Sequence, residues 1–424
     1  MSIAVTAATL TGNHGAEAML LATVGRLRER VPHATFEVFS HYAGADRARV
    51  ADPAVRFHGL RSGSLVFRLV PLAALLALAR RVGLGGMVRF LPSDVRALAR
   101  CRVQVDLAGV SFVAGRERYL AFNTLTLVPA FLLGVPVVKG SQAMGPFTSA
   151  PTRALARRVL GRCHAVFARG ERSFAHVRGL LGPSERVRRA ADVALLLEAR
   201  DALAQAGTPA MTRAMREIAE LRARARSVVG LCPSSLLAEK DPKAYVALFA
   251  ALATDLAAAG DLVVLFPHAT LGSADAGLRS NDLYAIARVL EMLPPAARAR
   301  VVPIEGDVHA VELLGLLRAL DLAVVSRFHA MVGALSVGLP PVVVGWSHKY
   351  QEVMEEFGLG GYVLDAHEAT PEAVMACLEA LRRDLPAHRS RVAEKLEGVR
   401  RSALEQIEHA ACVALGEKAV PSFR

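Results

Sequence analysis

A buried strand that runs directly into a helix constrains the fold of this chain more than any other feature of its sequence. Residues 321–345 have the pattern of a strand, a helix and a second strand, and the first junction carries Ser326, Arg327, Phe328 and His329. Two strands joined through a helix in this way are parallel. The helix start at the carboxyl end of a parallel strand offers free N–H groups and a partial positive charge. The junction therefore predicts an anion site, although Arg327 and His329 could instead cap and pair locally.

The same alternation of strands and helices recurs along both halves of the chain. In the first half we expect strands at 2–7, 35–40, 103–107 and 135–139. In the second half we expect strands at 227–233, 262–266, 301–304, 322–325 and 341–345. A length of 424 residues is more than one core usually serves. The pattern predicts an α/β chain with two Rossmann-like domains, similar to the GT-B architecture, whose parallel sheets face each other across a central cleft.

A helical stretch rich in Ala, Arg and Glu divides the two halves. We expect an N-terminal Rossmann-like domain at 1–200, a helical linker at 201–226, a C-terminal Rossmann-like domain at 227–384 and a helical segment at 385–424 that packs across the joint. The apolar pattern restarts at about residue 227, and this restart fixes the expected domain boundary.

The composition argues against several classes of protein. The net charge of +12 is spread along the chain without a basic run interleaved with aromatic residues, so nucleic acid is not an expected partner. The five cysteines are far apart and form no C-x-x-C pair, which indicates neither a disulfide framework nor a metal site. The first residues lack the pattern of a signal peptide, so the cytoplasm is the expected location.

One apolar segment, 65–89, has two interpretations. It is interrupted by Arg68 and Pro71 and contains three more arginines near its end. The segment is either a buried helix or a peripheral segment on the inner surface of a membrane, where anionic lipids attract basic residues.

The loop after the first expected strand is a candidate ligand site. It contains Gly12, Asn13, His14 and Gly15, followed by Glu17 at the start of a helix. Glycines allow tight turns and close approach of a ligand. His14 and Glu17 then face the ligand, or Glu17 merely complements the helix dipole.

Further polar residues follow other strands of the first half. Asp106, Ser111, Lys139 and Gln142 all lie at expected strand ends, and the carboxyl ends of parallel strands share one edge of a sheet. We expect these four residues near the same rim, where each either contacts a ligand or satisfies loop backbone groups.

Two other strand ends carry basic residues. Arg169 either faces the ligand or pairs with Glu171 or Asp192. His268 ends a strand of the second half and is expected at the same sheet edge as His329. Two histidines and an arginine at one edge indicate acid–base chemistry on an anionic substrate.

Taken together, these motifs resemble the polysaccharide pyruvyltransferase family. The matching segments are 12–18, 140–146, 168–173, Asp192, 267–268 and 326–330. The last of these, Ser-Arg-x-His-Ala, is the most specific. Members of the family transfer the pyruvyl group of phosphoenolpyruvate to a sugar diol as a cyclic ketal, and the resemblance implies no cofactor beyond this donor substrate. It implies a glycan or glycolipid acceptor on the N-terminal side and phosphoenolpyruvate on the C-terminal side.

The resemblance also implies roles for individual residues. Arg327 holds the carboxylate or phosphate of the donor, His329 or His268 acts as the acid and contacts the leaving phosphate, and Glu17 or His14 assists the acceptor hydroxyl. The expected catalytic residues are thus His329, His268 and Glu17. The expected substrate-binding residues are Arg327, Phe328, Ser326, Gly12, Asn13, His14, Gly15, Gln142 and Arg169.

The sequence departs from the family pattern at Ala16, where Asp is usual, and at Phe328, where Leu is frequent. Two alternatives stay open. A GT-B glycosyltransferase that uses a nucleotide sugar could employ Trp346, Tyr350 and Glu352, and the change at Ala16 is compatible with a non-catalytic member of the family. The acceptor sugar, the ketal linkage and the oligomeric state do not follow from the sequence.

Overall fold

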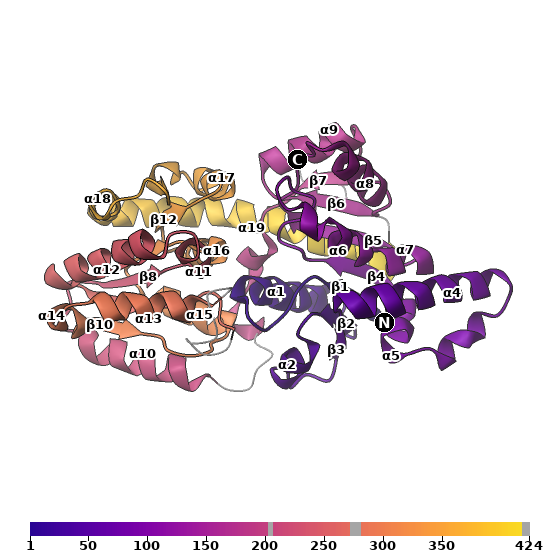
Figure 1. Ribbon diagram of the computed structural model, residues 1–424, viewed down its shortest axis with the longest axis horizontal. Coiled ribbons are helices and arrows are strands. Elements are labelled where there is room, and N and C mark those ends of the chain that lie inside the picture. The colour runs from indigo at the N-terminus through magenta and orange to yellow at the C-terminus, as the bar shows by residue number, and fades with distance from the viewer. Residues whose placement is uncertain (202–206, 272–280, 418–424) are drawn as a thin grey trace. The chain divides into compact units, whose positions relative to one another are not determined.

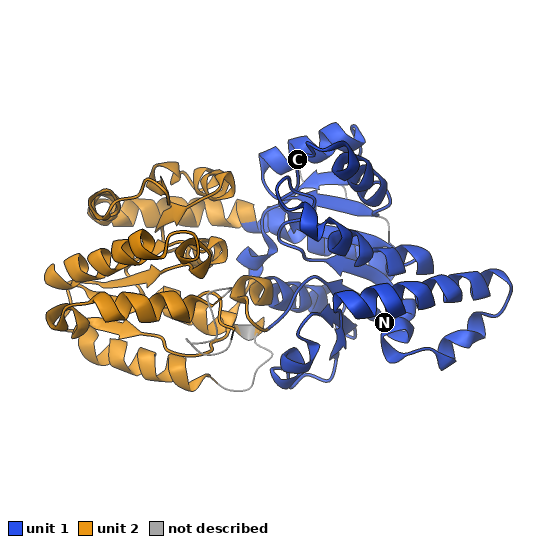
Figure 2. Cartoon of the chain, in the orientation of Figure 1, with its two compact units in different colours: residues 1–10, 19–196, 400–424 blue, residues 11–18, 197–399 orange. Residues whose placement is uncertain are grey.

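The chain forms two α/β units, each built on a parallel β-sheet, in a computed structural model that describes residues 1–201, 207–271 and 281–417 (Figure 1). Unit 1 contains residues 1–10 and 19–196 and the chain from Arg400 onward, and unit 2 contains 11–18 and 197–399 (Figure 2). The expected fold class, two parallel-sheet α/β domains, is confirmed. Two parts of the expected domain scheme, 202–206 of the linker and 418–424 at the end, lie outside the described residues.

The sheet of unit 1 has seven strands in the order β3-β2-β1-β4-β5-β6-β7. These strands are β1 (Ser2–Thr6), β2 (Thr35–Ser40), β3 (Val55–Gly59), β4 (Cys101–Asp106), β5 (Val137–Gln142), β6 (Ala165–Ala168) and β7 (Val187–Arg189). The strand order reverses between β1 and β4, which is where open α/β sheets bind ligands.

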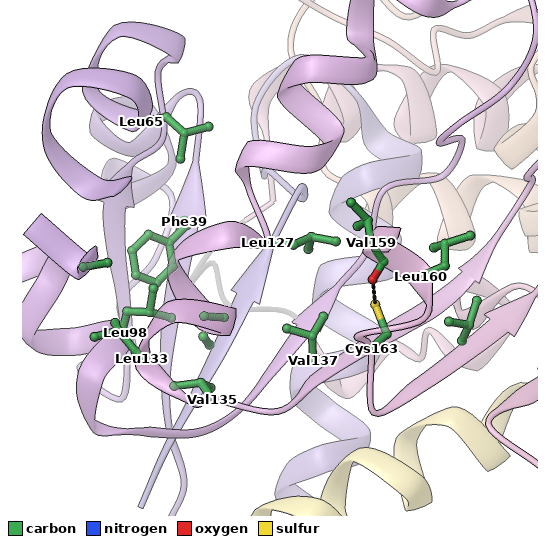
Figure 3. Packing of buried hydrophobic residues seen from close by; sticks show 14 of the residues in the cluster. Phe39, Leu65, Leu98, Leu127, Leu133, Val135, Val137, Val159, Leu160 and Cys163 are labelled. Atoms are coloured by element: carbon green, nitrogen blue, oxygen red, sulfur yellow. Dashed lines mark hydrogen bonds between the residues drawn. The ribbon is translucent and has the colours of Figure 1, made fainter. Parts of the chain in front are cut away.

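Helices cover this sheet and enclose its core. They are α1 (His14–Arg30), α2 (Ala43–Ala48), α3 (Ser62–Ser64), η1 (Leu65–Leu69), α4 (Val70–Arg81), η2 (Gly85–Phe90), α5 (Ser93–Arg100), η3 (Glu117–Tyr119), α6 (Leu120–Leu125), α7 (Val128–Leu133), α8 (Ala150–Leu160), α9 (Glu171–Leu181) and η4 (Val193–Leu196). Figure 3 shows part of the core, in which Phe39 and Val137 from the sheet belong to one cluster with Leu160 from α8 and Leu127 from the turn before α7.

The sheet of unit 2 has six strands in the order β10-β9-β8-β11-β12-β13. They are β8 (Val228–Cys232), β9 (Leu262–Leu265), β10 (Val301–Pro303), β11 (Leu322–Val325), β12 (Pro341–Gly345) and β13 (Val363–Asp365). The helical elements are η5 (Ala199–Asp201), α10 (Pro209–Arg222), α11 (Ser235–Ala238), α12 (Pro242–Ala258), α13 (Asp282–Met292), α14 (Pro295–Arg298), α15 (Ala310–Ala319), α16 (Phe328–Ser336), α17 (His348–Glu356), η6 (Gly360–Tyr362), α18 (Pro371–Arg383) and α19 (Leu385–Leu415), which continues into unit 1. The strand order reverses between β8 and β11, so the residues that follow these two strands meet at one crevice.

Local sequence explains why α16 ends and β12 begins where they do. Gly338 adopts a left-handed backbone conformation with φ of 79°, which favours glycine after a helix. The N–H of Leu339 then donates to the carbonyl of Ala334 at 2.9 Å and closes the helix. The Pro-Val-Val-Val-Gly run of β12 is buried throughout, as expected for a parallel strand with both faces covered.

Candidate functional site

The glycine-containing loop after β1 belongs to unit 2. The side-chain Oδ1 of Asn13 accepts hydrogen bonds from the N–H groups of Gly15 and Ala16, at 3.0 and 3.2 Å, and so caps α1. The N–H of His14 donates to the carbonyl of His268 at 3.3 Å. Gly15 packs so closely on His329 that an added Cβ would lie 2.1 Å from its Nδ1. The loop is therefore placed at the carboxyl ends of β9 and β11.

Glu17 orients two histidines from different parts of the chain. Its Oε2 accepts from Nδ1 of His14 at 2.9 Å, and its Oε1 accepts from Nδ1 of His309 at 3.1 Å. The N–H of Ala310 also donates to Oε2 at 3.0 Å. Burial alone would raise the pKa of Glu17, but the hydrogen bonds from His14 and His309 outweigh burial and lower it. Glu17 is thus an ionised, buried carboxylate whose oxygens are already engaged.

The network continues from His14 to the exposed edge of unit 2. Nε2 of His14 lies 3.0 Å from Oγ1 of Thr270, which itself donates to Oδ1 of Asp307 at 2.6 Å. Since Thr270 gives its single proton to Asp307, the ring nitrogen of His14 must donate to it. The other ring nitrogen donates to Glu17. His14 thereby links Glu17 to Thr270 and Asp307.

Arg327 is held by a buried carboxylate at the β8–β11 crevice. Its Nε lies 3.0 Å from both oxygens of Asp282, its Nη2 lies 2.5 Å from Oδ1, and Nη2 also donates to Oγ of Ser235 at 2.8 Å. Asp282 is fully buried and accepts further hydrogen bonds from the N–H groups of Ser235, His268 and Ala269. Burial alone would lower the pKa of Arg327, but Asp282 outweighs burial and raises it. Asp282 therefore fixes Arg327 and joins the ends of three strands.

His268 lies within this group of charges without carrying one. It is buried, and its ring is 6.0 Å from that of His14 in an edge-to-face arrangement. Burial lowers its pKa well below the usual value, and the positive charges of His14, His329 and Arg327 lower it further. His268 is therefore neutral at neutral pH and can accept a proton when an anion arrives.

Two lysines and three aromatic rings lie beside the start of α16. Lys349 Nζ is 4.9 Å from the ring centroid of Phe328 and 5.3 Å from that of Trp346. Lys240 Nζ is 5.4 Å from Trp346, and the rings of Phe328 and Tyr350 are 5.6 Å apart. Sequence reasoning did not select either lysine, because neither lies in a recognisable motif.

Two further predicted residues of unit 2, Ser326 and Gly12, are buried. The carbonyl of Ser326 accepts from the hydroxyl of Tyr350 at 3.1 Å. Gly12 has φ of 82°, and a Cβ there would lie 3.1 Å from Leu271. Both residues therefore shape the site through the backbone.

Unit 1 has a separate polar cluster at the ends of β4 and β5. Lys139 Nζ and Asp106 Oδ2 form a buried ion pair at 2.5 Å. Gln142 donates to the same carboxylate at 2.9 Å and accepts from the hydroxyl of Ser111 at 2.7 Å. The expectation that these four residues share one rim is confirmed. The four side chains also pair with one another, so each of them has a structural role in holding this cluster together.

Arg169 pairs with Asp192, one of the partners expected for it, and donates to the carbonyl of Gly109 at 3.0 Å. It is buried and supports the loop that follows β4. Beside this loop lies a cavity of about 180 Å³. Its lining residues are Val110, Ser111, Phe112, Val113, Arg116, Tyr119 and Asn123.

Within the described residues, no three His, Cys, Asp or Glu side chains are grouped so that they could hold a metal ion.

Two Rossmann-like units with polar strand-end clusters define a protein of the GT-B structural class. Solved structures similar to this chain include a putative UDP-N-acetylglucosamine 2-epimerase from Listeria monocytogenes, with 10% identity, a TM-score of 0.60, and coverage of 100% of this chain and 99% of the other. Another is a UGT transferase from Siraitia grosvenorii in complex with UDP, with 12% identity, a TM-score of 0.58, and coverage of 98% and 100%. These similarities show the fold. The family described as polysaccharide pyruvyl transferase matches residues 13–348, and the chain belongs to this family.

Proposed function

We propose that this protein transfers the pyruvyl group of phosphoenolpyruvate to a sugar diol of a polysaccharide or glycolipid precursor, forming a cyclic ketal and releasing phosphate. Membership of the polysaccharide pyruvyl transferase family supports a transferase that acts on a glycan. The observation that carries the proposal is the arrangement of Arg327, His329, His268 and the loop at 11–18 within one unit. The proposed reaction has two substrates, phosphoenolpyruvate and the sugar diol, and it uses no cofactor.

The donor anion would bind at the start of α16. Phosphoenolpyruvate carries a carboxylate and a phosphate, and free helix N–H groups and cationic side chains bind such groups. Nη1 of Arg327 donates no hydrogen bond to any described residue, while its other nitrogens are fixed by Asp282. Lys349 beside Phe328 supplies further positive charge.

Ketal formation then needs one proton donor and one acceptor. A proton added to the methylene carbon of the donor creates oxocarbenium character at the neighbouring carbon, which one sugar hydroxyl attacks. Phosphate leaves with the bonding electron pair and takes up the proton of the first hydroxyl, and the second hydroxyl closes the ring and gives up its proton. We assign the acid to His329, which is then neutral and can take the proton of the second hydroxyl, and we assign the contact with the leaving phosphate to His268, which is neutral before the donor binds and gains a proton beside the phosphate. Glu17 would act by positioning His14 and His309.

The acceptor would bind in unit 1, in the cavity beside Ser111. Its volume of about 180 Å³ is below the roughly 300–1,000 Å³ of sites for drug-sized ligands and suits one sugar ring. Tyr119 offers an aromatic face, and Arg116 and Asn123 offer hydrogen-bond donors to hydroxyl groups. We place the reaction in the cytoplasm, at the inner face of the membrane.

A second candidate function is glycosyl transfer from a nucleotide sugar. The partly exposed ring of Trp346 near the end of β12 favours it, because a nucleotide base stacks on such a ring, whereas the ring of Tyr350 is buried. However, Lys240 and Lys349 already lie over the ring of Trp346, so a base would have to displace them. A non-catalytic family member is a third candidate. The N–H of Ala16 is nonetheless held by Asn13, so the loop is ordered without the usual carboxylate.

Calorimetric titration distinguishes these functions. The purified protein is titrated with phosphoenolpyruvate and, separately, with UDP and GDP sugars. Saturable binding of phosphoenolpyruvate alone is expected, with His329→Gln reducing phosphate release with acceptor far more than donor affinity. Nucleotide-sugar binding without phosphoenolpyruvate binding would move the assignment to glycosyl transfer, and donor binding without turnover would favour the non-catalytic role.

A further inference from the structure

The helical stretch from Ser62 to Arg81 in unit 1 is apolar on two opposite faces. One face is buried in the core cluster, and its residues are Leu65, Leu69, Ala73 and Leu76. The other face is exposed, and its large apolar residues are Phe67, Leu75 and Leu78, followed by Val82 just after the helix end. The exposed residues follow one another at helical spacing, so they form one continuous stripe.

The turn that follows α4 extends this exposed apolar surface. Leu84 and Phe90 are exposed there, and the two aromatic side chains are the most open, with 84% of Phe67 and 74% of Phe90 accessible. Scattered exposed apolar residues are ordinary, but seven large apolar side chains exposed within residues 66–90 mark an interaction surface. Figure 1 shows α4 and the chain that returns from it to α5 at one end of unit 1.

The charged side chains of the segment that carries this surface are all arginines. Residues 53–93 contain six arginines and no Asp, Glu or Lys. Two of these arginines make contacts within unit 1. Arg68 pairs with Asp94 at 2.7 Å, and Arg80 donates to two backbone carbonyls. Arg81 and Arg89 are exposed beside the apolar stripe, and Arg89 lies 4.7 Å from the ring of Phe90.

We propose that residues 62–90 dock unit 1 onto an anionic lipid surface, with Phe67 and Phe90 among the acyl chains and Arg81 and Arg89 at the phosphate headgroups. A helix with an apolar side and flanking arginines binds anionic bilayers in this way. An anionic bilayer fits better than a protein partner, because it complements the positive charge and accepts an irregular apolar surface without matching its shape.

The packing of Ser62–Arg81 favours a position on the bilayer surface over a span across the bilayer. Ser62–Arg81 is the one helical stretch among the described residues that is long and apolar enough to cross a membrane, with a mean hydropathy of 1.8. However, its row of buried residues packs in the same cluster as residues of α5 and α7. Since a spanning helix would have to lose this packing, only the opposite face is available to lipid.

The test is sedimentation of the full-length protein with vesicles of stated composition. We expect the protein to sediment with vesicles of phosphatidylcholine containing 30% phosphatidylglycerol, and to stay in the supernatant with phosphatidylcholine alone. Alkaline carbonate should release the bound protein, because it removes peripheral proteins and leaves spanning ones.

Two double variants separate the apolar and charged contributions. Phe67→Ser/Phe90→Ser should reduce the partition coefficient at least tenfold, and Arg81→Gln/Arg89→Gln should reduce it by about fivefold per arginine. The matched controls lie in unit 2. Met292→Ser removes an exposed apolar residue of α13, and Arg213→Gln/Arg216→Gln removes the same charge from α10. Both controls should bind like the parent protein.

Three outcomes would overturn the proposal. The first is equal binding by the parent protein and both double variants. The second is resistance to carbonate, which would show a spanning helix. The third is absence of lipid binding together with a concentration-dependent dimer that Phe67→Ser/Phe90→Ser dissociates, which would show that a second copy covers this surface.

Discussion

The close packing of Gly15 on His329 predicts a specific defect in Gly15→Ala. The new methyl group would lie 2.1 Å from Nδ1, 2.3 Å from Cγ and 2.7 Å from Cβ of His329. Rotation of the imidazole cannot relieve the contact with Cβ, because Cβ does not move when the side chain rotates. The first turn of α16 or the loop itself must therefore shift.

The size of the effect follows from this geometry. Ordinary contacts of a methyl group begin at 3.4 Å, so the imidazole must withdraw by about 1.3 Å, the difference between 3.4 and 2.1 Å. Overpacking of this kind lowers the free energy of unfolding by about 1–3 kcal/mol. If His329 is the acid, a displacement of about 1 Å lowers kcat by roughly 100-fold.

Thermal unfolding and phosphate release together measure both effects. Gly315→Ala is the matched control, because Gly315 lies in α15 with open space around the position of an added Cβ, and Ala should stabilise the helix by about 0.5–1 kcal/mol. In a His329→Ala background Gly15→Ala should cost less stability, because the contacts with the ring are gone. Equal effects of Gly15→Ala and Gly315→Ala in both measurements would contradict the close packing of Gly15 on His329.

Three further predictions concern buried titratable side chains. Arg327→Ala should lower the free energy of unfolding by about 3 kcal/mol in a denaturant titration, because Asp282 stays buried without its cation but keeps its backbone donors, and an unchanged midpoint would contradict this. Lys139→Met should cost about 3–5 kcal/mol, and adding Asp106→Asn should restore most of it; no restoration would show that the pair is not coupled. Stability should fall as the pH drops from 6.5 toward 4, because burial first, and then nearby cations, lower the pKa of His409 to about 4, so only the unfolded chain takes up the proton. At pH 5 this proton uptake by the unfolded chain lowers the free energy of unfolding by on the order of 1 kcal/mol after allowing for screening. Thermal melts of His409→Phe at pH 7 and pH 5 should lack this part of the pH dependence.

Much of the fold could be predicted from the sequence, because its central strands are continuous apolar runs. The limits of β2, β11 and β12 agree with the expected strands at 35–40, 322–325 and 341–345. Three of the four edge strands, β3, β7 and β13, were not predicted. β13 and β7 have only three residues each, and β3 alternates apolar and polar residues over five, so none of them forms a long apolar run.

The candidate site could be predicted only in part. Strand ends located Arg327, His268 and His329, because the edge of a parallel sheet follows from topology. Their partners come from long-range contacts that local patterns do not encode. Asp282 reaches Arg327 across 45 positions, and Glu17 reaches His309 across 292.

The charge balance of the unit 2 site leads to one last prediction, that phosphoenolpyruvate binds with uptake of a proton. Asp282 already compensates Arg327, and His268 is neutral in the ligand-free protein because burial and nearby cations hold its pKa well below the usual value. A phosphate dianion beside His268 reverses this balance, since a nearby negative charge raises the pKa of an imidazole. Donor affinity should therefore increase as the pH falls from 8 toward 6.5, before the phosphate itself becomes protonated at a pKa of about 6.

Calorimetric titration at pH 7 in buffers of different ionisation enthalpy measures this uptake directly. We expect a fraction of one proton per donor bound in the parent protein, and a smaller fraction in His268→Asn, which keeps a hydrogen-bonding group but cannot titrate. Equal uptake in both proteins would assign the proton to another group, and zero uptake in the parent would mean that the donor phosphate does not approach His268. Because the measurement reports protons bound at equilibrium, it tests this contact without requiring the acceptor sugar.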